Sequence, residues 1–101
     1  MKGNNMKMVW IAYNQAIGEE VDECLKKCNI KSYTKIPLVH GVGQHSGPHM
    51  GTHIWPGVNS LLMIVCTEEI KEKLLEEVRR LKRTFEREGI KAFVVPVEEI
   101  T

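Results

Sequence analysis

Three histidines at regular four-residue spacing are the strongest chemical feature of this chain. His45, His49 and His53 lie in the segment 41–57, which holds five of the eight glycines and two of the four prolines. Imidazole is the commonest protein ligand for divalent metals such as Zn and Cu. So much glycine and proline argues against a helix, but side chains on a loop can still converge. The pattern predicts a candidate metal site at His45, His49 and His53, with hydrogen bonds to backbone or solvent as the simpler alternative.

The same segment could form a second kind of site, in which backbone N–H groups bind an anion. Gly41, Gly43, Gly47 and Gly51 would let the chain turn its amides toward a ligand, although neither established phosphate-loop motif is present. Trp55 is a residue type that anchors ligands and interfaces, and it could equally hold the segment against the body of the protein. The candidate ligand-binding residues are therefore Gly41, Gly43, Gln44, Gly47 and Trp55.

Enzyme activity has little support in the residue pattern, and we expect none. The segment 41–57 contains no carboxylate that could work with a histidine as acid and base. Cys66 with a histidine of that segment is the remaining nucleophile–base pair, so a small enzyme of this kind is kept as an alternative. The simpler expectation for all three cysteines, Cys24, Cys28 and Cys66, is that they are reduced and buried.

Composition narrows the class of protein. The 101 residues have a net charge near +1, are 43% hydrophobic and 27% charged, as is usual for a globular domain. The balanced charge argues against a nucleic-acid partner. No apolar run approaches the length of a membrane span, and the N-terminus lacks the apolar core of a signal peptide. We expect a cytoplasmic protein with one domain over residues 1–101 and a flexible loop at about 41–57.

Hydrophobic periodicity predicts six elements on either side of that loop. Alternating or continuous apolar runs indicate strands, and apolar residues at spacings of three and four indicate helices. The expected elements are strand 7–13, helix 18–28, strand 32–39, strand 59–66, helix 68–88 and strand 90–97.

The prolines predict how the strands are arranged. Pro37 and Pro96 mark the second and fourth strands as sheet edges, whereas the first and third strands are apolar on both faces, as covered central strands are. The order βαββαβ with central first and third strands is the ferredoxin-like pattern. We therefore expect an α+β sandwich, with an antiparallel four-stranded sheet, two helices on one face and the long loop between strands two and three.

Three short motifs make the chain similar to the PII-like superfamily, which includes the nitrogen regulatory P-II proteins and the CutA proteins. Gly41-Val42-Gly43 resembles the glycine pair at the root of the PII T-loop, the long loop between strands two and three. Residues 61–69 resemble the third strand of PII as it enters the second helix. Residues 91–98 resemble its fourth strand, with the Pro-Val-Glu typical of the family.

This resemblance implies a signalling protein rather than an enzyme. Members form homotrimers, hold ligands in clefts between subunits and contact target proteins through the T-loop. Many PII proteins bind ATP or ADP, and CutA proteins have a suspected link to divalent metals. The resemblance thus implies a trimeric regulator that binds a small ligand and contacts a protein partner through residues 41–57.

The chain departs from PII proteins in the loop 46–57, whose sequence is not that of ordinary PII and places the chain in a divergent branch, and again before the last strand. Arg87-Glu88-Gly89 stands where PII proteins carry a glycine-rich phosphate-binding loop. This difference argues against nucleotide binding of the ordinary PII kind. The cofactor is left unknown, with a divalent metal such as Zn or Cu as a candidate, and a metal sensor or buffer that uses the loop histidines is the first alternative function.

Overall fold

The computed structural model describes residues 5–41 and 58–101. Within these ranges the order of elements is β1 (Met6–Asn14), a single 3-10 turn η1 (Gln15–Ile17), α1 (Gly18–Lys27), β2 (Thr34–Val39), β3 (Asn59–Thr67), α3 (Glu68–Thr84) and β4 (Ile90–Pro96). None of the helices in this part of the chain is both long and apolar enough to cross a membrane.

The four strands form one antiparallel sheet in the order β2-β3-β1-β4. The apolar strands β1 and β3 are central, and the strands with Pro37 and Pro96 are at the edges, because a proline has no N–H to donate to a neighbouring strand. The ferredoxin-like arrangement predicted from the sequence is confirmed. β2 also contains an irregularity between Ile36 and Val39.

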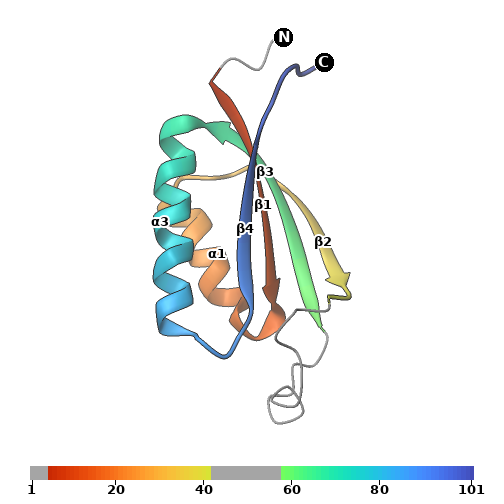
Figure 1. Cartoon of the computed structure of the whole chain (residues 1–101), viewed down its shortest axis with the longest axis vertical. Coiled ribbons are helices and arrows are strands. Elements are labelled where there is room, and N and C mark those ends of the chain that lie inside the picture. The colour runs from red at the N-terminus through yellow and green to blue at the C-terminus, as the bar shows by residue number, and fades with distance from the viewer. Residues whose placement is uncertain (1–4, 42–57) are drawn as a thin grey trace.

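Both helices cover the same face of the sheet (Figure 1). Alternate residues of the central strands point toward them, and the apolar stripe of α3 completes the layer between. Fully burying a side chain of this size contributes roughly 1.5–3 kcal/mol, so this layer accounts for most of the fold's stability. The core includes Val9, Ile11, Tyr13, Leu62, Ile64, Leu74, Val78 and Leu81.

The ends of the helices follow the capping chemistry of the sequence, with one exception. The Thr67 hydroxyl accepts a hydrogen bond from the Ile70 N–H at 3.3 Å, and Asn29 follows α1 with φ of 58°, as expected of an N-cap and a left-handed C-terminal residue. The predicted extension of the second helix to residue 88 is wrong, since α3 ends at Thr84. Phe85 leaves the helical conformation, with φ of −117° and ψ of 67°, and packs against the core.

The opposite face of the sheet is apolar but uncovered by the described part of the chain. We call this surface the open face. Two of its large side chains, Phe93 and Val95, are 59% and 41% exposed. The expectation that the central strands are covered on both faces is therefore wrong for a single chain. The apolar side chains of the open face are those of Met8, Trp10, Ala12, Ile36, Leu61, Met63, Val65, Phe93 and Val95.

Candidate functional site

Several connections meet at one end of the sheet. Gly41 and Val58 flank residues 42–57, and they lie at the same end as the turn between α3 and β4 (Figure 1). Two backbone hydrogen bonds join these connections to the end of β1. The Asn14 N–H donates to the Gly89 carbonyl at 2.9 Å, and the Gln15 N–H donates to the Val58 carbonyl at 3.0 Å. Chain segments far apart in sequence thus converge here.

Gly41 is the one predicted ligand-binding or metal-binding residue within the described ranges. It is exposed, its φ is not positive, and an added Cβ would lie 3.8 Å from the Asn59 Nδ2. The fold therefore does not require glycine at this position. The other candidate residues, Gly43, Gln44, Gly47, Trp55, His45, His49 and His53, lie outside the described residues.

No metal-binding cluster of histidine, cysteine or carboxylate side chains is present in residues 5–41 and 58–101. His40, the histidine within these ranges, is exposed at the end of β2. The histidine site at His45, His49 and His53 thus stays a prediction.

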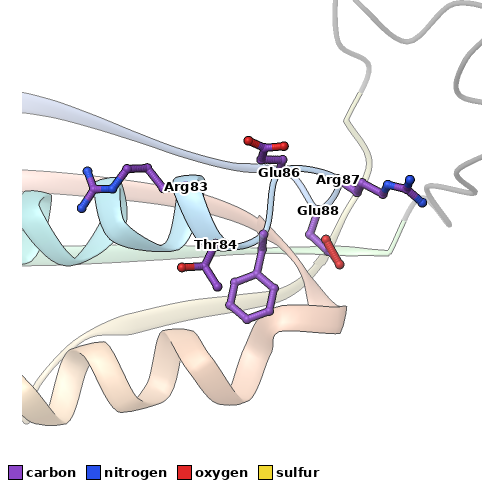
Figure 2. A pocket seen from close by; sticks show the side chains of 6 residues that line it. Arg83, Thr84, Glu86, Arg87 and Glu88 are labelled. Atoms are coloured by element: carbon purple, nitrogen blue, oxygen red, sulfur yellow. The ribbon is translucent and has the colours of Figure 1, made fainter.

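An open hollow of about 450 Å³ lies at the turn between α3 and β4 (Figure 2). Arg83 and Arg87 line it and make no ion pair with any residue that the structure describes. Glu86 and Glu88 also line it, so two positive and two negative charges leave its net charge at zero. Figure 2 shows the two arginine side chains pointing away from each other. One chain alone therefore provides cationic groups but no closed anion site.

Arg83, which lines this hollow, was not singled out by the reasoning from sequence. The basic residues near the end of α3 were assigned to a helix that continued to residue 88, and an exposed charged helix face carries no ligand signal. The structure ends α3 at Thr84, so Arg83 stands in the last turn of the helix and Arg87 in the turn that follows it. The high density of arginine just before Gly89 was the sequence feature that could have indicated a cationic surface here.

The cysteines are buried and free, as predicted for all three. Burial raises the pKa of the Cys66 thiol, which makes it a poor nucleophile at neutral pH. Cys66 is also seven residues along β3 from Asn59, about 23 Å at the usual rise per strand residue. It is thus far from the strand end that follows segment 42–57. The geometry gives no support to an enzyme built on Cys66.

A second thiol belongs to a polar contact between the helices. The Cys24 thiol donates to the Glu77 carboxylate across a Sγ–Oε1 distance of 3.6 Å, and Glu77 also pairs with Arg80 at 2.9 Å and Lys27 at 3.7 Å. Burial, and then the Glu77 charge, raise the pKa of Cys24 to about 11. This thiol stays protonated and joins α1 to α3.

Comparison with solved structures finds the same fold in PII-like proteins. CPII, a nitrogen regulatory PII-like protein from Thiomonas intermedia K12 bound to ADP, AMP and bicarbonate, is 21% identical, with a TM-score of 0.71 over 95% of this chain and 93% of that chain. A Thermus thermophilus protein described as a putative PII-like signaling protein is 24% identical, with a TM-score of 0.62 over 94% and 88%. The apo form of CPII is 15% identical, with a TM-score of 0.63 over 94% of each. No curated protein sequence matches the chain.

The described residues define a protein of the ferredoxin-like fold class, the fold of these PII-like structures. The sequence profile of the family "Nitrogen regulatory protein P-II" matches residues 6–101, and the chain belongs to this family. Its proteins are signalling regulators and not enzymes, so family membership confirms the expectation that this chain is not an enzyme.

Proposed function

We propose that this protein is a homotrimeric signalling regulator that binds a small ligand in clefts between subunits and modulates a partner protein through residues 41–57. The observation that carries the proposal is the family match over residues 6–101, together with an open apolar sheet face. The whole chain is then one PII-like domain, and the segment 41–57 occupies the T-loop position.

The open face supports self-association. Soluble monomers rarely expose a contiguous apolar surface of more than a few hundred Å². Here the exposed Val65, Phe93 and Val95 come from strands on either side of β1. Burying them against copies of the same face removes apolar surface from water, which favours a closed symmetric assembly.

An adenine nucleotide is the first ligand to test. A related structure contains ADP, AMP and bicarbonate, and the hollow beside Arg83 and Arg87 lies at the turn where this chain lacks a glycine-rich loop. Its zero net charge means that a phosphate would need further cations. The segment 42–57 contains no lysine or arginine, so a neighbouring subunit would supply them, which favours a cleft between subunits over a pocket within one chain.

The candidate residues in the T-loop position complete the proposed site. Gly41, Gly43, Gln44, Gly47 and Trp55 would contact the ligand, and ligand binding would order the segment and change its contact with a partner protein. The alternative function is a sensor or buffer for Zn or Cu that uses His45, His49 and His53.

Two measurements test the proposal. Analytical ultracentrifugation should give three times the chain mass of 11.5 kDa; a monomer at high concentration would contradict the assembly.

Isothermal titration with ADP, AMP and ATP should give micromolar binding to at least one of these nucleotides, and Arg87→Ala should weaken that binding at least tenfold. Lys82→Ala, on the exposed end of α3, is the matched control. If Arg87→Ala leaves the nucleotide affinity unchanged, the nucleotide does not bind at the turn between α3 and β4 as proposed.

Zinc and copper titrations test the alternative function, a metal sensor or buffer. If the metal function holds, the wild type binds metal at micromolar levels and the triple variant His45→Ala, His49→Ala, His53→Ala does not. Equal binding by both proteins, or none by either, would eliminate it.

A further inference from the structure

The hollow at the turn between α3 and β4 presents negative as well as positive groups to a ligand. Residues 83–88 line it, and the charged ones among them are Arg83, Glu86, Arg87 and Glu88. None of these four makes an ion pair with any residue that the structure describes. The two carboxylates are therefore not neutralised within the described part of the chain, and a ligand in the hollow meets them as charges.

The backbone of this turn is attached at both ends, which keeps the carboxylates at the hollow. Phe85 leaves the helix and packs against the core, and the Gly89 carbonyl accepts a hydrogen bond from the Asn14 N–H at 2.9 Å. Only residues 86–88 lie between these two attachments. So short a segment has little freedom to move, and the backbones of Glu86 and Glu88 stay beside the hollow.

Glu86 and Glu88 are also the two neighbours of Arg87 in the chain. Consecutive Cα atoms are about 3.8 Å apart, and the Debye length at physiological ionic strength is about 8 Å. Figure 2 shows the three side chains leaving the turn in different directions. A phosphate that pairs with Arg87 therefore lies in the field of carboxylates that salt screens only in part.

The net effect of this lining depends on how many charges the ligand carries. A single phosphate can pair with one guanidinium at short range through two parallel hydrogen bonds. Each further phosphate adds roughly one negative charge, and it enters a hollow where carboxylates equal arginines in number. The further phosphates thus gain no net attraction from this chain, whereas a lining without carboxylates would attract them.

We propose that Glu86 and Glu88 are specificity-determining residues that make the hollow select a nucleoside monophosphate over a triphosphate. The inference rests on the proposed function, because it concerns the ligand held at the turn between α3 and β4. It narrows that function to phosphate ligands of low charge. The volume of about 450 Å³ lies within the range of small-molecule sites.

Equilibrium dialysis of the full chain against AMP and against ATP, in low salt with EDTA, tests the inference. The wild type should bind AMP more tightly than ATP. The double variant Glu86→Gln, Glu88→Gln keeps the side-chain shapes and removes both charges, so it should shift the ratio of affinities roughly tenfold toward ATP. Two carboxylates acting on two further phosphate charges make four charge pairs, and each pair near 8 Å is worth a factor of about two in water.

A second double variant is the matched control for net charge. Glu69→Gln with Glu72→Gln also removes two exposed carboxylates, but from the start of α3, at least roughly 18 Å along the helix from Thr84. It should leave the ratio of AMP to ATP affinity unchanged. Added salt should reduce the selectivity of the wild type, because screening weakens a charge effect and leaves a steric one in place.

The outcomes separate this inference from the proposed function. If nucleotides bind but the Glu86→Gln, Glu88→Gln variant keeps the wild-type ratio, or if the control variant shifts it equally, the inference is overturned and the proposed function stands. If neither the wild type nor the variant binds AMP or ATP, the proposed nucleotide function fails and the inference fails with it.

Magnesium distinguishes repulsion from a bridging role of the carboxylates. Mg²⁺ neutralises part of the charge of ATP, so it should bring the wild type and the Glu86→Gln, Glu88→Gln variant closer together in ATP affinity. If the variant instead binds ATP more weakly than the wild type when Mg²⁺ is present, the carboxylates hold the cation, and their proposed role against triphosphates is overturned.

Discussion

Trp10 lies directly opposite Phe93 across β1 and β4, on the face of the sheet that the helices leave open. Phe93 is 59% exposed, and Met63 lies opposite Trp10 on the other side. Aromatic and methionine side chains in such a row are typical of the apolar centre of an interface. This row is therefore where the proposed assembly is most sensitive to substitution.

Phe93→Glu should dissociate the assembly. A carboxylate in the middle of a buried apolar interface costs several kcal/mol unless it is paired. Sedimentation should shift from trimer to monomer, and in a Trp55→Phe background the Trp10 fluorescence should move to longer wavelength as water reaches the indole. Lys73→Glu changes an exposed residue on the helix layer and should leave both signals unchanged. A trimer that persists in Phe93→Glu would place the interface elsewhere.

Gly41→Ala should separate the needs of folding from those of binding. Because an added Cβ has room and φ is not positive, the free energy of unfolding should change by no more than about 0.5 kcal/mol. If Gly41 contacts the ligand, calorimetry should show at least tenfold weaker ADP binding. Gly18→Ala, where a Cβ meets nothing within 4 Å, is the matched control. Unchanged ADP affinity would remove Gly41 from the site.

Removing the Tyr13 hydroxyl should stabilise the protein. This oxygen is buried without a hydrogen-bond partner among the described residues, and burying an unpaired hydroxyl costs about 1–3 kcal/mol. Tyr13→Phe should therefore raise the free energy of unfolding by about 1 kcal/mol in urea denaturation. Tyr33→Phe, at a side chain that is 47% exposed, should have little effect. A loss of stability in Tyr13→Phe would show that the hydroxyl is hydrogen-bonded.

The buried thiols should make the protein less stable in alkali. Burial raises the pKa of Cys24 to about 11, whereas a thiol in the unfolded chain ionises near pH ~8.5. Between these values the unfolded state has lost a proton that the folded state retains, so stability falls as pH rises. Below about pH 8.5 the thiol is protonated in both states, and the contribution of its raised pKa to the free energy of unfolding is fully present. Urea midpoints at pH 7.5 and 10 should differ less in Cys24→Ala than in the wild type, and an equal difference would contradict the assignment.

Much of the fold could be predicted from the sequence because its signals are local. Pro37 and Pro96 have no N–H to donate to a neighbouring strand, which assigned their strands to the edges. Thr67 and Asn29 marked helix ends by their own hydrogen-bonding and backbone preferences. The end of α3 could not be predicted in this way. Phe85 continues the apolar stripe of a helix, and only its packing against the core and the return of the chain into β4 stop the helix at Thr84.

The candidate site, like the fold, could be predicted from the sequence only in part. The unusual composition of residues 41–57 indicated by itself where a ligand or partner would bind, and residue types alone proposed the histidines, glycines and Trp55. The contacts of Gln15 with Pro37 and Ser60 span 22 and 45 residues of sequence. Hydrophobic periodicity describes near neighbours and could not have predicted these contacts.

The sequence by itself determined the order of elements, the place of each strand in the sheet and the family, because propensity, capping and alternation act between near neighbours. Only the tertiary structure decided which apolar face lacks a cover, which arginines line the α3–β4 turn, and that Asn14 and Gln15 connect this turn to both ends of segment 42–57. These relationships depend on distances between residues remote in the chain, and such distances are set by packing.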